Sequence, residues 1–213
     1  MNFEAFLNSI SKIEHVPLPG QDSQFKMSPP YRMDLIAQQK EAMKHSKKAG
    51  VMALFYPDMS YETKLILILR KTYKGVHSAQ VGFPGGKYEI EDNSLQITAL
   101  RETNEEVGVP INDMKVLKAM TEVYIPPSNF TVYPFLGIAT KTPNFLKQDD
   151  EVEDLIEVAI KDLVDDQFAT SQLIMTSLQK EVEVPAFQLN GHLVWGATAM
   201  MLSEIKELLK TVL

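Results

Sequence analysis

The chain has 213 residues, of which 45% are hydrophobic and 23% charged, and its formal net charge is -7. This composition fits one enzyme-sized globular domain, and no stretch approaches the roughly 18 consecutive apolar residues of a membrane-spanning helix. The negative charge argues against nucleic acid or an anionic membrane as the main partner. The absence of cysteine excludes disulfides, thiolate metal sites and cysteine nucleophiles, and it fits a reducing cytoplasm. No signal peptide is expected, because the N-terminus lacks a basic start followed by an apolar core.

Hydrophobic periodicity and turn residues predict the elements in chain order. A helical extension is expected over about residues 1–48, with helices at 2–13 and 32–48 and a proline- and glycine-containing connector at 17–30. Strands are predicted at 50–55, 64–71, 114–124, 131–139, 153–160, 172–176 and 181–188. One helix is expected between residue 94 and residue 108, and another closes the chain at 198–212. Mixed strands with helices on both faces predict an α/β fold, an α/β/α sandwich with a mixed sheet.

The most informative stretch runs from Gly85 to Val109. Glu102, Glu105 and Glu106 are spaced i, i+3 and i+4, so in a helix they share one face. Like charges at these spacings destabilise a helix by roughly 0.2 to 0.5 kcal/mol per pair. A solvated acidic surface is the ordinary interpretation of such a face. The other interpretation is a site for a hard divalent cation such as Mg²⁺, which carboxylates bind together with substrate phosphates.

The ends and the opposite face of this helix are also marked in the sequence. Three residues are candidate N-caps, and Gln96 follows the second of them at the spacing of a capping box: Asp92, Asn93 and Ser94. Gly108 and Pro110 predict the C-terminal end. An apolar stripe is expected opposite the glutamates, at Ile97, Leu100 and Val107.

Glycines and charged residues of this stretch recur at the offsets of a known motif. The second half of the pattern G-x5-E-x7-R-E-U-x-E-E-x-G-U, the Nudix box, is matched by Arg101, Glu102, Glu105, Glu106, Gly108 and Val109. Counting from Gly86, Asp92 replaces the first glutamate and Arg101 follows after eight residues instead of seven, while Thr103 stands at an aliphatic position. The altered spacing resembles the coenzyme A pyrophosphatase branch of the Nudix superfamily.

Three segments outside the box resemble the same branch. The first runs from an apolar strand through Arg70, His77 and Gln80 to Phe83-Pro84-Gly85-Gly86, with Ala79 in place of the usual glycine. The others are the loop Pro126–Phe130 and the closing segment Gly191–Ala199. Within the last segment we expect Trp195 to be a core or helix-packing residue.

The resemblance implies a single Nudix hydrolase domain over 1–213 with a Nudix-type α/β/α sandwich. It implies a metal-dependent pyrophosphatase that cleaves coenzyme A or a derivative to 3′,5′-ADP and 4′-phosphopantetheine or its acyl form. Mg²⁺ or Mn²⁺ would be held by Glu102, Glu105 and Glu106, and the catalytic residues would be Arg101, Glu105 and Glu106. Arg101 is expected to orient Glu105 by a bidentate contact. Substrate-binding residues would be Arg70, His77, Gln80, Gly85 and Gly86, with weaker candidates at Lys71 and Lys74.

Several alternatives stay open at this point. The general base is either a glutamate of the box or an acidic residue of the run at Glu151, Glu153, Asp154 and Glu157, for which a solvated surface is the ordinary interpretation. The substrate is a small molecule, either coenzyme A or a related nucleoside diphosphate such as ADP-ribose or NADH, and a nucleoside triphosphate is a further option. A non-catalytic Nudix-fold sensor is the alternative from another class. The sequence leaves the oligomeric state open, including a homodimer, and we expect a cytoplasmic location.

Overall fold

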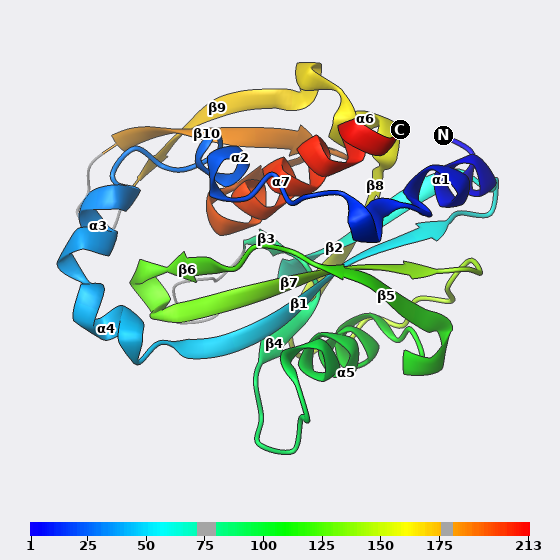
Figure 1. The fold of residues 1–213 in the computed structure, drawn as a ribbon, viewed down its shortest axis with the longest axis horizontal. Coiled ribbons are helices and arrows are strands. Elements are labelled where there is room, and N and C mark those ends of the chain that lie inside the picture. Colours follow the sequence, from blue (N-terminus) through cyan, green and yellow to red (C-terminus); the bar gives the residue numbers. More distant parts are fainter. Residues whose placement is uncertain (72–79, 176–180) are drawn as a thin grey trace.

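The computed structural model describes residues 1–71, 80–175 and 181–213. Its helices are α1 (Phe3–Ile10), α2 (Gln21–Phe25), α3 (Arg32–Gln38), α4 (Lys40–Lys44), α5 (Leu95–Val107), α6 (Ile160–Val164) and α7 (Gly196–Val212). Its strands are β1 (Lys47–Pro57), β2 (Thr63–Arg70), β3 (Val81–Gly82), β4 (Gly85–Lys87), β5 (Met114–Ala119), β6 (Val123–Ile125), β7 (Phe130–Ala139), β8 (Val152–Ala159), β9 (Ala169–Met175), β10 (Glu181–Leu189) and β11 (His192–Trp195). Figure 1 shows these elements as layers around a twisted central sheet.

The central sheet is mixed. Its main path is β3-β2-β1-β7-β5, and β4, β6 and β8 pair with β1, β7 and β2 respectively. β1 and β7 run parallel, whereas the neighbouring pairs run antiparallel. Helix α5 covers one face of this sheet, and α1 and α7 lie on the other (Figure 1). The predicted α/β/α sandwich with a mixed sheet is therefore confirmed.

Strand β1 supplies both hydrophobic cores because successive side chains of a strand point to opposite faces. Ala53 and Phe55 join the core that includes the buried residues of α1 and α7. Leu54 and Tyr56, between and beyond them, join the smaller core under α5. A strand buried on both faces reads as a continuous apolar run, which is the pattern of residues 51–56.

A second sheet lies beside the first and contains β9, β10 and β11 in antiparallel order. The strands predicted at 172–176 and 181–188 belong to it, and β11 was not predicted. The strand predicted at 114–124 is interrupted, because β5 ends at Ala119 and β6 begins at Val123.

The helix predicted at 32–48 is wrong in its length. The chain leaves helical geometry at Gln39, whose φ and ψ are -111° and 20°, so two short helices form in place of one. Lys47 and Lys48 belong to β1, where they pair with Phe130 and Thr131 of β7. Helix propensity is a weak preference here, and parallel pairing with a buried strand overrides it.

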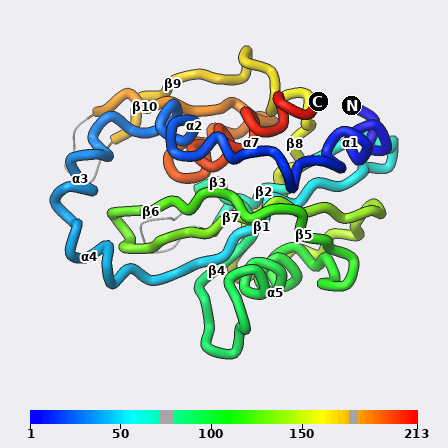
Figure 2. The backbone as a smooth tube through the Cα atoms, viewed as in Figure 1, coloured from blue at the N-terminus to red at the C-terminus, as the bar shows by residue number. Residues whose placement is uncertain are grey.

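A buried carboxylate attaches the N-terminal segment to the last helix. Glu204 of α7 is fully buried and accepts hydrogen bonds from Gln24 Nε2 at 2.9 Å, Thr121 Oγ1 at 2.6 Å and the Gly20 N–H at 3.2 Å. The tube in Figure 2 shows the N-terminal segment running across α7, with both termini on the same side of the molecule. In the part of the chain that the structure describes, no helix is long and apolar enough to cross a membrane.

Helix α5 approaches β1 closely at Gly50. A Cβ atom at this position would lie 2.3 Å from the carbonyl oxygen of Leu95 and 3.0 Å from the amide nitrogen of Ala99. Both neighbours are backbone atoms, so they cannot move aside without displacing the helix. Glycine at position 50 therefore fixes how near the acidic helix sits to the sheet.

We expect Gly50→Ala to lower the free energy of unfolding by about 1–3 kcal/mol or more, as overpacking of a core does. Urea unfolding measures the change. Gly82→Ala is the matched control, because its Cβ would have its nearest neighbour, Arg70 Nε, at 3.8 Å. Equal stability of the two variants would contradict this account of the helix position.

Candidate active site

Helix α5 begins and ends where its capping residues stand. Ser94 is the N-cap, and its side chain accepts a hydrogen bond from the Ile97 N–H at 3.3 Å. The capping box expected with Gln96 does not form, because that residue is second in the helix and not third. Gly108 adopts the left-handed conformation, with φ of 77°, and ends the helix as predicted. Leu100 and Val107 are buried, but Ile97 is 37% exposed, so its place in the apolar stripe was wrong.

Glu106 is the most buried of the three glutamates, with 2% of its side chain exposed. Its Oε2 accepts a hydrogen bond from the Gly85 N–H at 2.7 Å. Its Oε1 lies 3.4 Å from Arg70 Nη1, an ion-pair distance without the geometry of a hydrogen bond. Arg70 Nη2 also donates to the Gly85 carbonyl oxygen at 2.7 Å. Helix, loop and β2 are thereby joined at one carboxylate.

Glu102 faces the same loop one turn earlier. A Cβ atom at Gly86 would lie 2.3 Å from the carboxylate of Glu102, so only glycine leaves room for this side chain at the loop. Glu105 differs from the other two, because 54% of its side chain is exposed and it pairs with Arg101. The structure thus brings Glu102 and Glu106 to the glycine loop and leaves Glu105 at the rim.

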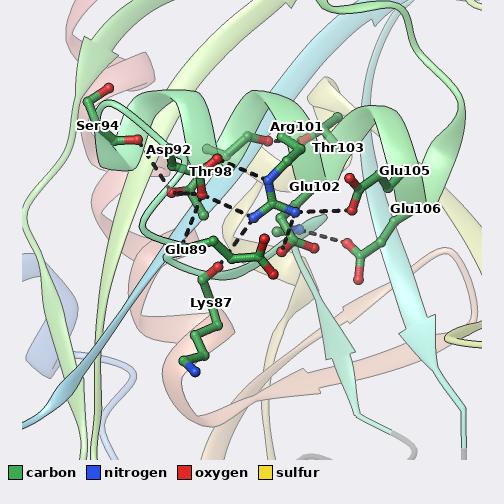
Figure 3. A network of polar contacts seen from close by, with 12 residues as sticks. Lys87, Glu89, Asp92, Ser94, Thr98, Arg101, Glu102, Thr103, Glu105 and Glu106 are labelled. Carbon is green, nitrogen blue, oxygen red and sulfur yellow. Dashed lines mark hydrogen bonds and ion pairs between the residues drawn. The ribbon is translucent and has the colours of Figure 1, made fainter.

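Arg101 organises the first half of the site through Asp92, as Figure 3 shows. Its Nε and Nη2 donate to the two oxygens of Asp92 at 3.0 and 3.1 Å. Its Nη1 lies 3.1 Å from an oxygen of Glu102 and 3.1 Å from an oxygen of Glu105. The expected bidentate contact with Glu105 was wrong in its partner: the bidentate partner is Asp92, and Glu105 receives a single contact.

Asp92 is a buried structural carboxylate. It is 4% exposed and also accepts hydrogen bonds from Thr98 Oγ1 at 2.8 Å and from the Glu89 N–H at 3.2 Å. The hydrogen bonds from Arg101 are the main reason that the pKa of Asp92 falls to about 2. Asp92 occupies the position of the first glutamate of the box, and both of its carboxylate oxygens accept hydrogen bonds from Arg101.

The pKa values of the two loop-facing glutamates, Glu102 and Glu106, are raised, whereas that of Asp92 is lowered. Burial raises the pKa of Glu106 to about 7, against the lowering effects of Arg70 and the Gly85 N–H. Burial also raises the pKa of Glu102. The negative charge of Glu151 adds to both increases, so this residue of the acidic run lies near the pair. Glu157 instead accepts a hydrogen bond from the Tyr56 hydroxyl at 2.6 Å.

The donor set fits a hard divalent cation. Oε1 of Glu106 is buried with no hydrogen-bond partner in the described chain, although a buried carboxylate oxygen ordinarily has one. Two carboxylates beside a substrate site are what Mg²⁺ commonly uses, with waters and phosphate oxygens completing its coordination. Within the described ranges no three acidic or histidine side chains already converge as a metal-binding group. Glu102 and Glu106 would therefore hold the ion together with substrate oxygens.

A cavity of about 1170 Å³ opens beside the glycine loop. Four segments that are distant in the sequence line it: Tyr31–Gln39, Gly82–Lys87, Ile125–Phe130 and Trp195–Thr198, in each case with some of their residues. Arg70 and Gln80 line it as well. Trp195 is partly buried and lines this cavity, a position that the expected core or helix-packing role did not include. No sequence pattern predicted that residues of the N-terminal segment form a wall of this cavity.

The remaining predicted residues are placed as follows. The Gln80 carbonyl oxygen accepts a hydrogen bond from the Arg70 N–H at 3.1 Å, which continues the β2–β3 pairing. The Lys71 N–H donates to the Glu151 carbonyl oxygen at 2.9 Å. His77 and Lys74 lie outside the described residues.

Comparison with known proteins assigns the family. Residues 46–178 match the NUDIX domain family, which is more than half of the chain, so the protein belongs to the Nudix family and is a hydrolase of that class. It is 29% identical over 161 residues to "Uncharacterized Nudix hydrolase NudL" of Pectobacterium atrosepticum, covering 72% of this chain and 79% of that protein. A protein of the same description from Yersinia pestis is 28% identical over 147 residues, covering 68% and 72%.

A solved structure shows the same fold. The Nudix hydrolase RenU of M. smegmatis superposes with a TM-score of 0.54 at 14% identity, covering 79% of this chain and 88% of that one. Nudix hydrolases generally use divalent metal ions, which agrees with the oxygen-rich site at Glu102 and Glu106.

We expect Asp92→Asn to lower the free energy of unfolding by about 1.5–3 kcal/mol at neutral pH, because an amide cannot accept two charge-assisted bonds from Arg101. The pKa of Asp92 in the folded protein is about 2, below the unfolded value of about 3.9. This stabilisation is therefore complete above the unfolded pKa and is lost as pH falls through the folded one. Urea unfolding at several pH values should show the difference from wild type shrinking only below about pH 4. A difference that stays constant into acid would contradict the assignment.

Gly86→Ala is expected to weaken Mn²⁺ binding by about 10- to 100-fold, the range seen when groups that orient ligands are changed. The new methyl group would displace the flexible carboxylate of Glu102 and leave the backbone in place, so thermal stability should change little. Electron paramagnetic resonance of Mn²⁺ titrations measures the affinity. Unchanged affinity would remove Glu102 from the ion site.

Proposed function

We propose that this Nudix hydrolase cleaves the diphosphate of coenzyme A or an acyl derivative, giving 3′,5′-ADP and 4′-phosphopantetheine or its acyl form. The supporting observation is the cavity beside the box. The three segments that resemble the coenzyme A branch, which end at Gly86, Phe130 and Ala199, each contribute residues to its wall. Segments that bind one substrate are expected to meet at one cavity. Segments that resemble a family for structural reasons alone need not meet there.

The reaction assigns a role to each charged residue at the loop. Glu102 and Glu106 would hold Mg²⁺ or Mn²⁺, and such an ion supplies charge neutralisation on the diphosphate and a more acidic bound water. Arg70 holds Glu106 and the Gly85 carbonyl, which fixes the loop against the metal-binding carboxylates. Arg101 holds Glu102 from the other side, with Asp92 fixing the guanidinium plane.

Glu151 is the general base that we favour. Its charge acts on both Glu102 and Glu106, and its backbone connects to Lys71 at the end of β2. In this proposal its carboxylate accepts the proton of the attacking water. Glu105, which the resemblance makes a ligand and catalytic residue, contributes in this proposal through Arg101 at the exposed rim. A single domain over 1–213 and a cytoplasmic location belong to the same proposal.

A second substrate class is open because the box selects diphosphate chemistry and not the groups attached to it. ADP-ribose and NADH also contain a diphosphate, and the geometry of the glycine loop and helix α5 would serve them equally. The walls of the cavity, which are separate from the box, would distinguish between these compounds.

The test is a turnover panel with coenzyme A, an acyl-coenzyme A, ADP-ribose and NADH at equal concentrations with Mg²⁺ or Mn²⁺. We expect coenzyme A compounds to be cleaved fastest, with 3′,5′-ADP identified by mass spectrometry and ¹⁸O water marking the attacked phosphorus. Much faster cleavage of ADP-ribose would overturn the proposed substrate. Stabilisation by coenzyme A without any product over a long incubation with Mn²⁺ would indicate a sensor.

Glu106→Gln is expected to reduce kcat in this assay by at least about 100-fold, because an amide would bind the ion that makes the attacking water more acidic less tightly than a carboxylate does. The exposed residue Glu14 provides the control: Glu14→Gln changes the same atoms far from the cavity and should leave turnover unchanged. Nearly full turnover in Glu106→Gln would remove this carboxylate from the mechanism.

A further inference from the structure

Arg32 is a buried cation in the wall of the large cavity. It begins helix α3, is 7% exposed, and lines the cavity together with Gly85 and Gly86. Its Nη2 donates to the carbonyl oxygen of Tyr124. Its Nε is buried without a hydrogen-bond partner in the described part of the chain.

The three arginines of the chain are placed differently. Arg70 is paired with Glu106, and Arg101 with Asp92, Glu102 and Glu105. Arg32 has no carboxylate within ion-pair distance among residues 1–71, 80–175 and 181–213. The segments 72–79 and 176–180 contain no Asp or Glu in their sequence. The missing counter-ion of Arg32 is therefore not a side-chain carboxylate of its own chain.

Two acidic residues line cavities to which Arg32 also contributes. Asp34 lines the same cavity, and Glu122 lines a smaller adjoining cavity of about 370 Å³ to which Arg32 also contributes. Neither forms an ion pair with the guanidinium. Burial lowers the pKa of Arg32 below its usual range. A buried guanidinium is costly unless an anion and further hydrogen bonds compensate it, so the position requires an external partner.

We propose that Arg32 binds a phosphomonoester of the substrate, at a subsite of the cavity separate from the diphosphate at the glycine loop. The planar guanidinium fork matches a phosphate bidentately, and Tyr31 and Gln38 add donors along the same wall. The inference rests on the proposed function in one respect: coenzyme A carries such a group on its ribose, whereas ADP-ribose and NADH do not. Arg32 is then the residue that selects between these substrates.

Binding of the product nucleotides tests the subsite without turnover. We will compare 3′,5′-ADP with 5′-AMP by isothermal titration calorimetry at constant ionic strength, because the pair differs only by the phosphomonoester. Wild type should bind 3′,5′-ADP at least about tenfold more tightly, because the phosphomonoester accepts charge-assisted hydrogen bonds from the guanidinium. Arg32→Met should abolish the preference and leave the affinity for 5′-AMP unchanged. The exposed residue Lys40 is the charge-matched control, and Lys40→Met should keep the preference.

Thermal unfolding of the free protein gives an independent measurement. Because Arg32→Met replaces an uncompensated buried charge by an apolar side chain, it should unfold at the same or a higher temperature than wild type. A structural role through Tyr124 predicts the reverse, namely a lower unfolding temperature with the nucleotide preference intact. That combination would overturn the proposal, as would equal affinity of wild type for the two nucleotides.

Arg32→Lys keeps the test decisive if the methionine variant does not fold. It retains the charge and loses the planar fork, so the preference for 3′,5′-ADP should fall several-fold, and an unchanged preference contradicts the proposal. Failure of the proposed activity and failure of the subsite give different results. If coenzyme A is not cleaved but the Arg32-dependent preference is observed, the subsite stands and the substrate changes. If coenzyme A is cleaved and wild type shows no preference, the subsite fails alone.

Discussion

Helix α5 lies against the sheet and the loop at residues 85–86 at a distance that side chains would not allow. At Gly50 the helix backbone comes within contact of the strand backbone, and at Gly86 the carboxylate of Glu102 occupies the space of a missing Cβ atom. This approach places Glu106 where its oxygen accepts the Gly85 N–H. The remaining features of the site, its burial, its raised carboxylate pKa values and its capacity for a cation, follow from that contact.

Two arginines, Arg70 and Arg101, form ion pairs with different acidic residues of the site. Arg70 approaches from the end of β2 and stabilises Glu106, while Arg101 lies on the helix and is fixed by Asp92. The residue that departs from the motif therefore has a physical role. Asp92 lies ahead of the Ser94 cap, and its short side chain is held by Arg101, Thr98 and the Glu89 N–H. The extra residue of the spacing is accommodated before the helix starts, so the register of the three glutamates is preserved.

The large cavity brings residues outside the Nudix box to the candidate site. Its walls come from both ends of the chain, and Glu204 on α7 secures the N-terminal segment that carries one of them. Helix α3 is consequently part of the cavity wall and not a separate appendage. Arg32 lies buried in this wall with its Nε unpaired in the described part of the chain, and this position is the basis of the proposed phosphomonoester subsite.

Much of the fold followed from sequence patterns whose cause is local. The strands at 50–55 and 64–71, the box helix with Gly108 at its end and the closing helix were predicted, because strand burial, helix periodicity and capping depend on nearby residues. The glutamates at one helix face were predicted for the same reason. The helix expected at 32–48 was wrong, since pairing of Lys47 and Lys48 with β7 is a long-range contact that helix propensity does not report.

The sequence by itself determined the family, the reaction class and the acidic residues that are candidates to hold an ion. Only the tertiary structure decided how those residues are used. Glu102 and Glu106 meet the glycine loop while Glu105 remains exposed, and the bidentate partner of Arg101 is Asp92 and not Glu105. The placement of Arg32 and Trp195 in the cavity wall was likewise decided there. Each of these outcomes depends on which distant segments pack together, and spacing along the chain contains no information about that packing.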